Sequence, residues 1–208
     1  MCSECAKKIT YIEEPRCKKC GKPIHYAEKE YCHDCEMRNF FYEQGKSLWP
    51  HIGPVKWSIY QFKYRNRRIY AEFYAKELYR IYGKNLKDWE IDVIIPVPLH
   101  WRKKRKRGYN QAEVLARKLG ELCGIEVDTK CVKRIYNTRP QKELSQKQRK
   151  KNLEDAFCTT KHWKPYKHVL LVDDIYTTGN TIDAVARKIK EKGACKVMFL
   201  TISIGQGF

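Results

Sequence analysis

Residues 169–181 have the sequence VLLVDDIYTTGNT, in which four apolar residues precede two adjacent carboxylates and a short loop rich in hydroxyl groups. The apolar run predicts a buried strand, and a helix is predicted from about residue 180 to 192. A glycine lets a phosphate approach the backbone, and the amino end of a helix favours an anion. The stretch therefore predicts either a site for a phosphorylated sugar or only a strand followed by a capped helix.

Strands and helices alternate on both sides of this stretch. Strands are predicted at 55–64, 91–98, 130–136, 168–173 and 196–204, and helices at 68–83, 110–124 and 180–192. This alternation predicts an α/β fold whose parallel sheet is flanked by helices. Its ligand site should lie at the carboxyl ends of the strands, where the quoted stretch ends.

Six of the ten cysteines form three C-x-x-C pairs before residue 36. Two residues between thiolates allow a tight turn to direct both sulfurs at one tetrahedral zinc ion. The predicted ligands of one structural zinc ion are Cys17, Cys20, Cys32 and Cys35. Cys2 and Cys5 are either half of a second site or are completed by a histidine, His25 or His33, neither of which is included in the predicted set.

The length and the charge limit the organisation and the class of partner. A chain of 208 residues accommodates one α/β domain and a small appendage. We expect a zinc-ribbon module at 1–45 and the main domain at 50–208. The net charge of +19 predicts a polyanionic partner, with nucleic acid first and an anionic membrane surface second.

Apolar runs long enough to span a bilayer, and a segment of signal-peptide type, are both absent from the sequence. The expected location is therefore the cytoplasm, without membrane insertion. A reducing compartment also favours metal binding over disulfides for the paired cysteines.

The order of residues in 169–181 resembles the phosphoribosyl pyrophosphate-binding motif of type I phosphoribosyltransferases. The resemblance implies that Asp173 and Asp174 contact the ribose hydroxyls and help to hold Mg²⁺ with the ligand. Both acids can serve one ligand if the strand ends where they begin. The implied contacts of the 5′-phosphate are Thr177, Thr178, Gly179, Asn180 and Thr181. Purine salvage enzymes of this family carry an aspartate at the position of Thr177, so salvage of hypoxanthine or guanine is not expected.

A pyrophosphate leaving group requires cations and backbone donors opposite the ribose. The segment IPVPLHWRKKRKRGYNQ follows a predicted strand and contains six consecutive basic residues, Arg102 to Arg107. The resemblance implies that the pyrophosphate loop lies near Pro98 to His100. The candidate anion contacts are Arg105, Arg107 and Asn110. Most of the basic run should be solvated or lie on a nucleic acid backbone.

A polar stretch at 138–155 resembles the mobile loop that closes over the site in these enzymes. Reaction at C1 of phosphoribosyl pyrophosphate passes through an oxocarbenium-like state, so a lid that excludes water has a clear purpose. The alternative interpretation of this stretch is a disordered basic linker, and both can hold in the absence of ligand. Its candidate contacts are Gln141, Ser145, Arg149 and Asn152.

Taken together, the cysteine pairs and the segments FKYRNRR, PVPLHWRKKRKRGYNQAEVLA, RPQKELSQKQRKKNLEDAF and VLLVDDIYTTGNT resemble the ComF family. That resemblance implies a phosphoribosyltransferase-type domain with an amino-terminal zinc ribbon. It also implies a role in DNA uptake during natural transformation, on the cytoplasmic side, with single-stranded DNA and a helicase-like competence protein as partners. Many members begin with one further cysteine pair, which would complete a second zinc site.

Two main functions remain open from the sequence. One is a protein of DNA uptake that binds phosphoribosyl pyrophosphate, or bare phosphate, without an assumption of turnover. The other is an active Mg²⁺-dependent phosphoribosyltransferase of nucleotide or cofactor metabolism, with an unknown acceptor and no role with DNA. A third, weaker interpretation is a phosphate-binding scaffold whose zinc ribbon contacts a protein.

Overall fold

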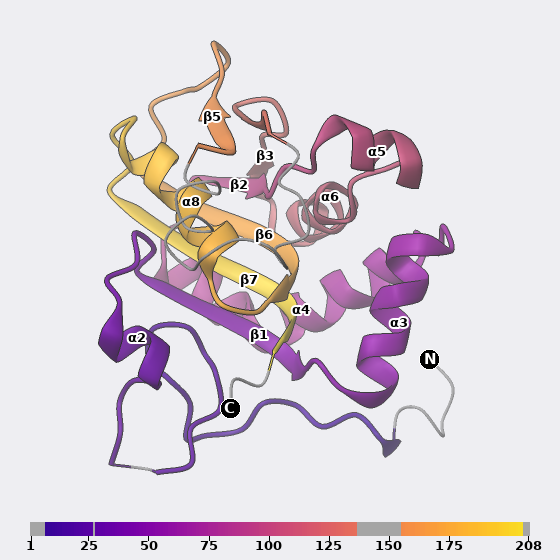
Figure 1. Cartoon of the computed structure of the whole chain (residues 1–208), viewed down its shortest axis with the longest axis vertical. Helices are drawn as coiled ribbons and strands as arrows, with labels where there is room; N and C mark the ends of the chain where they lie inside the picture. The colour runs from indigo at the N-terminus through magenta and orange to yellow at the C-terminus, as the bar shows by residue number, and fades with distance from the viewer. Residues whose placement is uncertain (1–6, 27, 137–154, 206–208) are drawn as a thin grey trace.

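A five-stranded parallel sheet forms the centre of the computed structural model, which describes residues 7–26, 28–136 and 155–205 (Figure 1). The strand order is β1-β7-β6-β2-β3. All neighbouring pairs are parallel, so the carboxyl ends of the five strands share one edge. The strands are β1 Gln44–Pro50, β2 Val93–Pro96, β3 Glu126–Val127, β6 His168–Tyr176 and β7 Lys196–Ile204.

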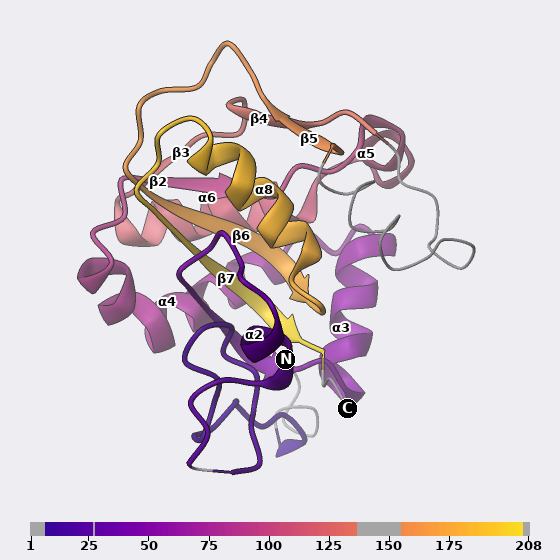
Figure 2. The same ribbon diagram turned by 60° about the vertical axis from the view of Figure 1, so that its left-hand side comes forward.

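Helices cover both faces of this sheet (Figure 2). The helices are α2 His33–Met37, α3 Gly53–Tyr64, α4 Tyr70–Asp88, α5 Trp101–Arg107, α6 Gln111–Cys123 and α8 Asn180–Lys190. Alternate residues of β6 enter two separate cores. Leu170 and Val172 pack with α3, α4 and α6, whereas Val169 and Leu171 pack with α8 and the cysteine module. A strand that is buried on both faces has the continuous apolar sequence seen here.

A second, two-stranded antiparallel sheet joins β4 (Val132–Arg134) and β5 (Phe157–Thr159). Phe157 and Val132 belong to the core that contains α8, so this small sheet covers the same face of the large sheet as α8. In the described part of the chain, no helix is both long and apolar enough to cross a membrane.

The cysteine module is attached to the edge strand β1 by backbone contacts. The Gly45 N–H donates to the Lys19 carbonyl at 2.7 Å, and Gln44 Nε2 donates to the Lys18 carbonyl at 2.9 Å. Gly21 has a φ of +74°, and a Cβ there would lie 2.9 Å from the Gly45 oxygen. Glycine at 21 therefore permits both the turn and the close approach to β1.

The structure differs from the sequence-based expectations at several elements. The segment 55–64 is part of helix α3 and not a strand, because Val55, Ile59 and Phe62 form one buried helical face. Helix α4 does not end at Gly83 but continues to Asp88, since Leu86 is buried one turn later. Strands β1, β3 and β5 and helices α2 and α5 were not predicted, and the predicted strand at 130–136 forms β4 of the antiparallel pair instead of joining the parallel sheet.

The remaining elements confirm the α/β class with a parallel sheet. The helix at α6, the helix at α8 and the last strand, β7, fall where the periodicity predicts them.

Candidate functional site

Strand β6 carries both predicted ribose-binding carboxylates. The strand does not end at Asp173 as expected but continues to Tyr176, with Asp173 beside Thr201 and Tyr176 beside Ile204 of β7. Within a strand, neighbouring side chains point to opposite faces. Asp174 is buried at 7% exposure and Asp173 is half-buried. The two acids consequently occupy different environments.

Asp174 forms an ion pair with Lys63, a residue that was not among the predicted site residues. Lys63 Nζ lies 2.9 Å from Asp174 Oδ1, and the two side chains are 17% and 10% exposed. Lys63 is the penultimate residue of α3. It was missed because 55–64 was assigned to a strand, although the helical spacing of the buried residues in that segment is a usable signal. The ion pair anchors the end of α3 to the sheet.

Burial, together with the negative charge of Asp174, raises the pKa of Asp173 to about 7, although the positive charges of Lys63 and Arg134 oppose this rise. The Asp174 N–H also donates to Asp173 Oδ1 at 2.8 Å, which favours the ionised form. Near neutral pH a bound cation would thus compete with a proton at Asp173.

The loop after β6 has an exposed hydroxyl face and a tightly fixed glycine. Thr177 and Thr178 are exposed. Gly179 has a φ of +78° and is the N-cap of α8. A Cβ at Gly179 would lie 2.5 Å from the Tyr176 hydroxyl oxygen, so any larger residue would displace that ring. The loop therefore presents hydroxyls and the amino end of a helix at the same edge as Asp173.

The linker that follows the cysteine module contacts this loop directly. Arg38 Nη2 donates to Asn180 Oδ1 at 2.6 Å, and Arg38 Nη1 lies 3.5 Å from the Thr178 carbonyl oxygen. The Phe41 N–H donates to Asp183 Oδ1 at 2.6 Å in the first turn of α8. No sequence signal identified Arg38, because 140 residues separate it from Thr178.

Of the three predicted anion contacts near α5, Asn110 and Arg107 bond to other groups of the protein, and Arg105 is exposed. Asn110 is buried and caps α6: its Oδ1 accepts from Ala112 N at 3.2 Å and its Nδ2 donates to the Val97 carbonyl at 3.0 Å. Arg107 donates to Gln111 Oε1 at 3.0 Å and to the Tyr64 hydroxyl at 3.0 Å. Arg105 is exposed. Asn110 thus has a structural role in the described contacts.

A cavity of about 440 Å³ lies beside the carboxyl end of β2. Its lining includes Pro96, Trp101, Lys104, Arg134 and Ile135. Arg134 connects the cavity to the site, since its charge lowers the pKa of Asp173. The lining combines apolar groups with three cations, Lys104, Lys133 and Arg134, and one carboxylate, Glu113, which pairs with Lys104 at 3.1 Å. The net positive charge suits a ligand that has an apolar part and a negative charge.

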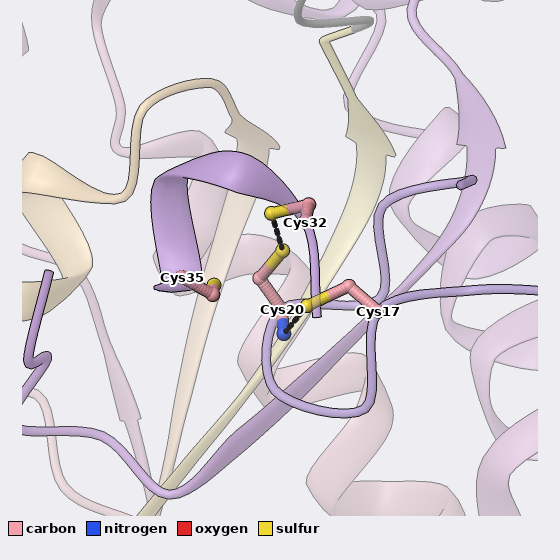
Figure 3. Close-up of side chains that lie close together, drawn as sticks. All are labelled: Cys17, Cys20, Cys32 and Cys35. Atoms are coloured by element: carbon pink, nitrogen blue, oxygen red, sulfur yellow. Dashed lines mark hydrogen bonds between the residues drawn. The ribbon is translucent and has the colours of Figure 1, made fainter. Parts of the chain in front are cut away.

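The four predicted zinc ligands converge on one point (Figure 3). Their sulfur atoms all lie within 4.8 Å of one another, and Cys20 Sγ lies 3.6 Å from Cys32 Sγ. Sulfurs about 3.8 Å apart are expected around a tetrahedral zinc with Zn–S bonds of about 2.3 Å. Four thiolates fit such an ion and leave no coordination position for a substrate. The structure thus brings the four predicted ligands together, as a structural zinc site requires.

Several predicted residues lie outside the described part of the chain. They include Cys2 and Cys5 and the whole predicted lid at 138–155 except Asp155. The expectations for both segments remain predictions.

Two family models match separate segments of this chain. The phosphoribosyl transferase domain family matches residues 69–203, and the double zinc ribbon domain matches residues 1–36. Competence protein F of Haemophilus influenzae is 34% identical over 69% of this chain. DNA utilization protein YhgH of Salmonella typhimurium is 29% identical over 73%, and competence protein ComFC of Bacillus subtilis is 26% identical over 72%.

The matched segments cover 65%, 67% and 59% of these three relatives, so the chain spans about two thirds of their length or less. Among solved structures, purine phosphoribosyltransferase from Pyrococcus horikoshii aligns with a TM-score of 0.39 and 16% identity. That alignment covers 65% of this chain and 86% of the other.

Proposed function

The chain belongs to the phosphoribosyl transferase domain family, with a double zinc ribbon domain at its amino end and ComF proteins among its relatives, and from this premise we propose two linked activities. The carboxyl end of β6 binds phosphoribosyl pyrophosphate with Mg²⁺. The protein works in DNA uptake, where it binds single-stranded DNA.

The observation that carries the ligand proposal is the arrangement at the end of β6. Asp173 stands before a loop with two exposed threonines, and Gly179 leads into the eleven-residue helix α8. Carboxylates accept hydrogen bonds from vicinal hydroxyls, and hydroxyls with a helix amino end favour a phosphate. A ribose 5-phosphate offers hydroxyls to the carboxylate and a phosphate to the threonine loop and the helix amino end. The proposed phosphate contacts are Thr177, Thr178, Gly179, Asn180 and Thr181.

The charges of the site support a ligand that arrives with a metal ion. Lys63 already neutralises Asp174, so Asp173 is the acid with capacity for a further cation. Mg²⁺ would supply charge neutralisation for the pyrophosphate. The chain itself would add cations from Arg105 and Arg107 of α5, beside the end of β2.

The DNA proposal rests on the relatives and on the charge. The relatives are called competence and DNA utilization proteins, and this chain carries a net charge of +19. Helix α5 consists of a tryptophan and six basic residues. Phosphate neutralisation by such a run gives binding that weakens steeply with salt. We extend the proposal to the cytoplasmic side of DNA uptake, with a helicase-like protein as partner.

A second candidate function, transfer of phosphoribose to an acceptor, is favoured by the cavity beside β2. In such a transfer the nucleophile would form a bond to C1 of the ribose while the bond from C1 to the pyrophosphate oxygen breaks. The 440 Å³ cavity is large enough for a small acceptor, and Arg134 on its wall faces the charge of Asp173. Release of pyrophosphate in the presence of candidate acceptors would reveal turnover.

Calorimetric titration with phosphoribosyl pyrophosphate and MgCl₂ tests the ligand proposal. We expect binding by the parent protein, and none that is measurable when Asp173→Asn and Asp174→Asn are combined. Lys192→Ala, at the far end of α8, is the matched control and should bind as the parent does. Absence of binding by the parent protein would overturn the proposal.

A further inference from the structure

Helix α3 exposes three aromatic side chains in a row. Trp57, Tyr60 and Tyr64 are 62%, 42% and 54% exposed. Their spacing of three and then four residues places them on one face of the helix. The helix is held to the protein by its opposite face, which includes Val55, Ile59 and Phe62. The exposed rings are thus not required for the core.

The three rings form a continuous ladder that ends in a cation. Trp57 and Tyr60 are stacked, with centroids 5.5 Å apart and planes at 11°. Tyr60 and Tyr64 follow, with centroids 5.1 Å apart and planes at 45°. The Arg107 guanidinium lies 4.8 Å from the Tyr64 ring centroid and donates to its hydroxyl. Arg107 therefore joins the ladder to helix α5.

The two segments that carry the ladder and Arg107 contain basic residues and no acidic ones, although Lys104 of α5 is paired with Glu113 at 3.1 Å and Lys63 of α3 with Asp174 at 2.9 Å. Residues 53–69 and 101–107 contain no aspartate or glutamate. Exposed cations on the α3 segment are Lys56, Arg65, Arg67 and Arg68. Exposed cations on α5 include Arg102, Lys104, Arg105 and Lys106. An exposed aromatic row beside so many cations is complementary to a polyanion that also offers flat apolar faces.

We propose that Trp57, Tyr60 and Tyr64 form a base-stacking platform for single-stranded DNA, with the phosphates held by Arg102 and Lys106 of α5 and by Arg65, Arg67 and Arg68. The inference rests on the DNA role proposed above and adds the place and the mode of binding. Every base has a π-face, so a ladder of rings binds a single strand with little sequence preference. A duplex keeps its bases stacked on each other and can use only the cations.

The platform adjoins the ribose-phosphate site. Lys63, the residue before Tyr64, holds Asp174 by the 2.9 Å ion pair. A strand bound along α3 would therefore lie on the same helix that closes one side of that site. This placement allows both ligands to be bound at once, on different faces of α3.

Fluorescence anisotropy with labelled oligo(dT) of about 20 nucleotides tests the platform. We expect Trp57→Ala to weaken binding about tenfold and the triple variant Trp57→Ala, Tyr60→Ala, Tyr64→Ala to weaken it about a hundredfold. Trp57→Phe should restore most of the loss, because a ring is retained. Tyr26→Ala is the matched control: Tyr26 is 66% exposed but lies in the cysteine module, and its loss should change nothing.

Two further experiments separate the contribution of base stacking to DNA affinity from that of charge. On an abasic oligonucleotide of the same length, the parent and the triple variant should bind equally, because only the phosphates remain. The slope of log affinity against log salt should be unchanged in the triple variant and reduced when Arg102 and Lys106 are neutralised.

The outcomes distinguish this inference from the proposal beneath it. Oligo(dT) binding by the triple variant that equals the parent's would overturn the platform and leave the DNA role intact. Absence of DNA binding by the parent would overturn both. A preference for oligo(U) over oligo(dT) would also overturn the platform. So would a triple variant that binds DNA normally but no longer binds a protein partner.

Discussion

The two sites of this protein are assembled in opposite ways. The cysteine cluster draws all four ligands from residues 17–35, the first pair from a tight turn and the second pair from the start of the short helix α2. The site at β6 combines Asp173 and Asp174 with Lys63 from α3 and Arg38 from the module linker. The first site is complete within a short segment, whereas the second exists only when distant elements pack. Local ligand sets can be recognised from spacing, and assembled sites cannot.

Loss of the cysteine cluster is the largest expected effect and tests whether the first site is self-sufficient. Cys17→Ser, or removal of zinc with a strong chelator, should unfold the module, because zinc supplies roughly 10 kcal/mol or more to the folding of small zinc modules. Zinc content and circular dichroism measure the loss. Cys195→Ser, at an exposed free cysteine, is the control and should retain zinc. A variant of Cys17 with full zinc content would contradict the Cys₄ assignment.

Removal of Lys63 is the next largest effect and tests whether the second site depends on α3. Lys63→Met leaves Asp174 buried without its partner, and we expect a loss of about 2–3 kcal/mol in unfolding free energy. Urea denaturation measures it. Combination with Asp174→Asn should recover most of the loss, since no uncompensated charge remains. Equal destabilisation by the single and double variants would refute the ion-pair explanation.

The pH dependence of ligand binding tests the charge state of the assembled site. The pKa of Asp173 is raised to about 7, so affinity for phosphoribosyl pyrophosphate with Mg²⁺ should rise about tenfold from about pH 6 to about pH 8. Asp173→Asn should remove that rise, as measured by calorimetry. A parent affinity that is flat across this range would show that Asp173 does not titrate there.

The same shift predicts an opposite trend in stability. Between the ordinary aspartate pKa and about 7, the folded state binds more protons than the unfolded state at Asp173. The contribution of this group to stability is therefore complete at low pH and is lost as the pH rises through about 7. Asp173→Asn should stabilise the protein at about pH 8 by roughly 1–2 kcal/mol, measured by thermal denaturation.

The smallest expected effect concerns the contact between the two regions. Arg38→Ala removes the hydrogen bond to Asn180, and we expect about a fivefold loss of affinity for phosphoribosyl pyrophosphate, which corresponds to about 1 kcal/mol. Thermal stability and zinc content should stay near the parent values. An unchanged affinity would mean that the module linker does not help to position the loop.

The sequence predicted the parts of the molecule that depend on short-range patterns. The α/β class followed from alternating periodicity, and the Cys₄ set followed from spacing. The segment 55–64 was misassigned because its apolar residues fit two periods over a short span. Strand β1 was missed because Gly45 and Pro50 are poor strand residues, and only pairing with β7 makes the segment a strand.

The sequence by itself determined the chemistry available at the end of β6: two carboxylates, three threonines and a glycine in a fixed order. The tertiary structure decided how that chemistry is partitioned. Continuation of β6 to Tyr176 separated the two acids, and the packing of α3 paired Asp174 with Lys63 and left Asp173 to titrate. The physical reason is that burial and the charges of distant residues set the state of a carboxylate, and neither is encoded in its neighbours along the chain.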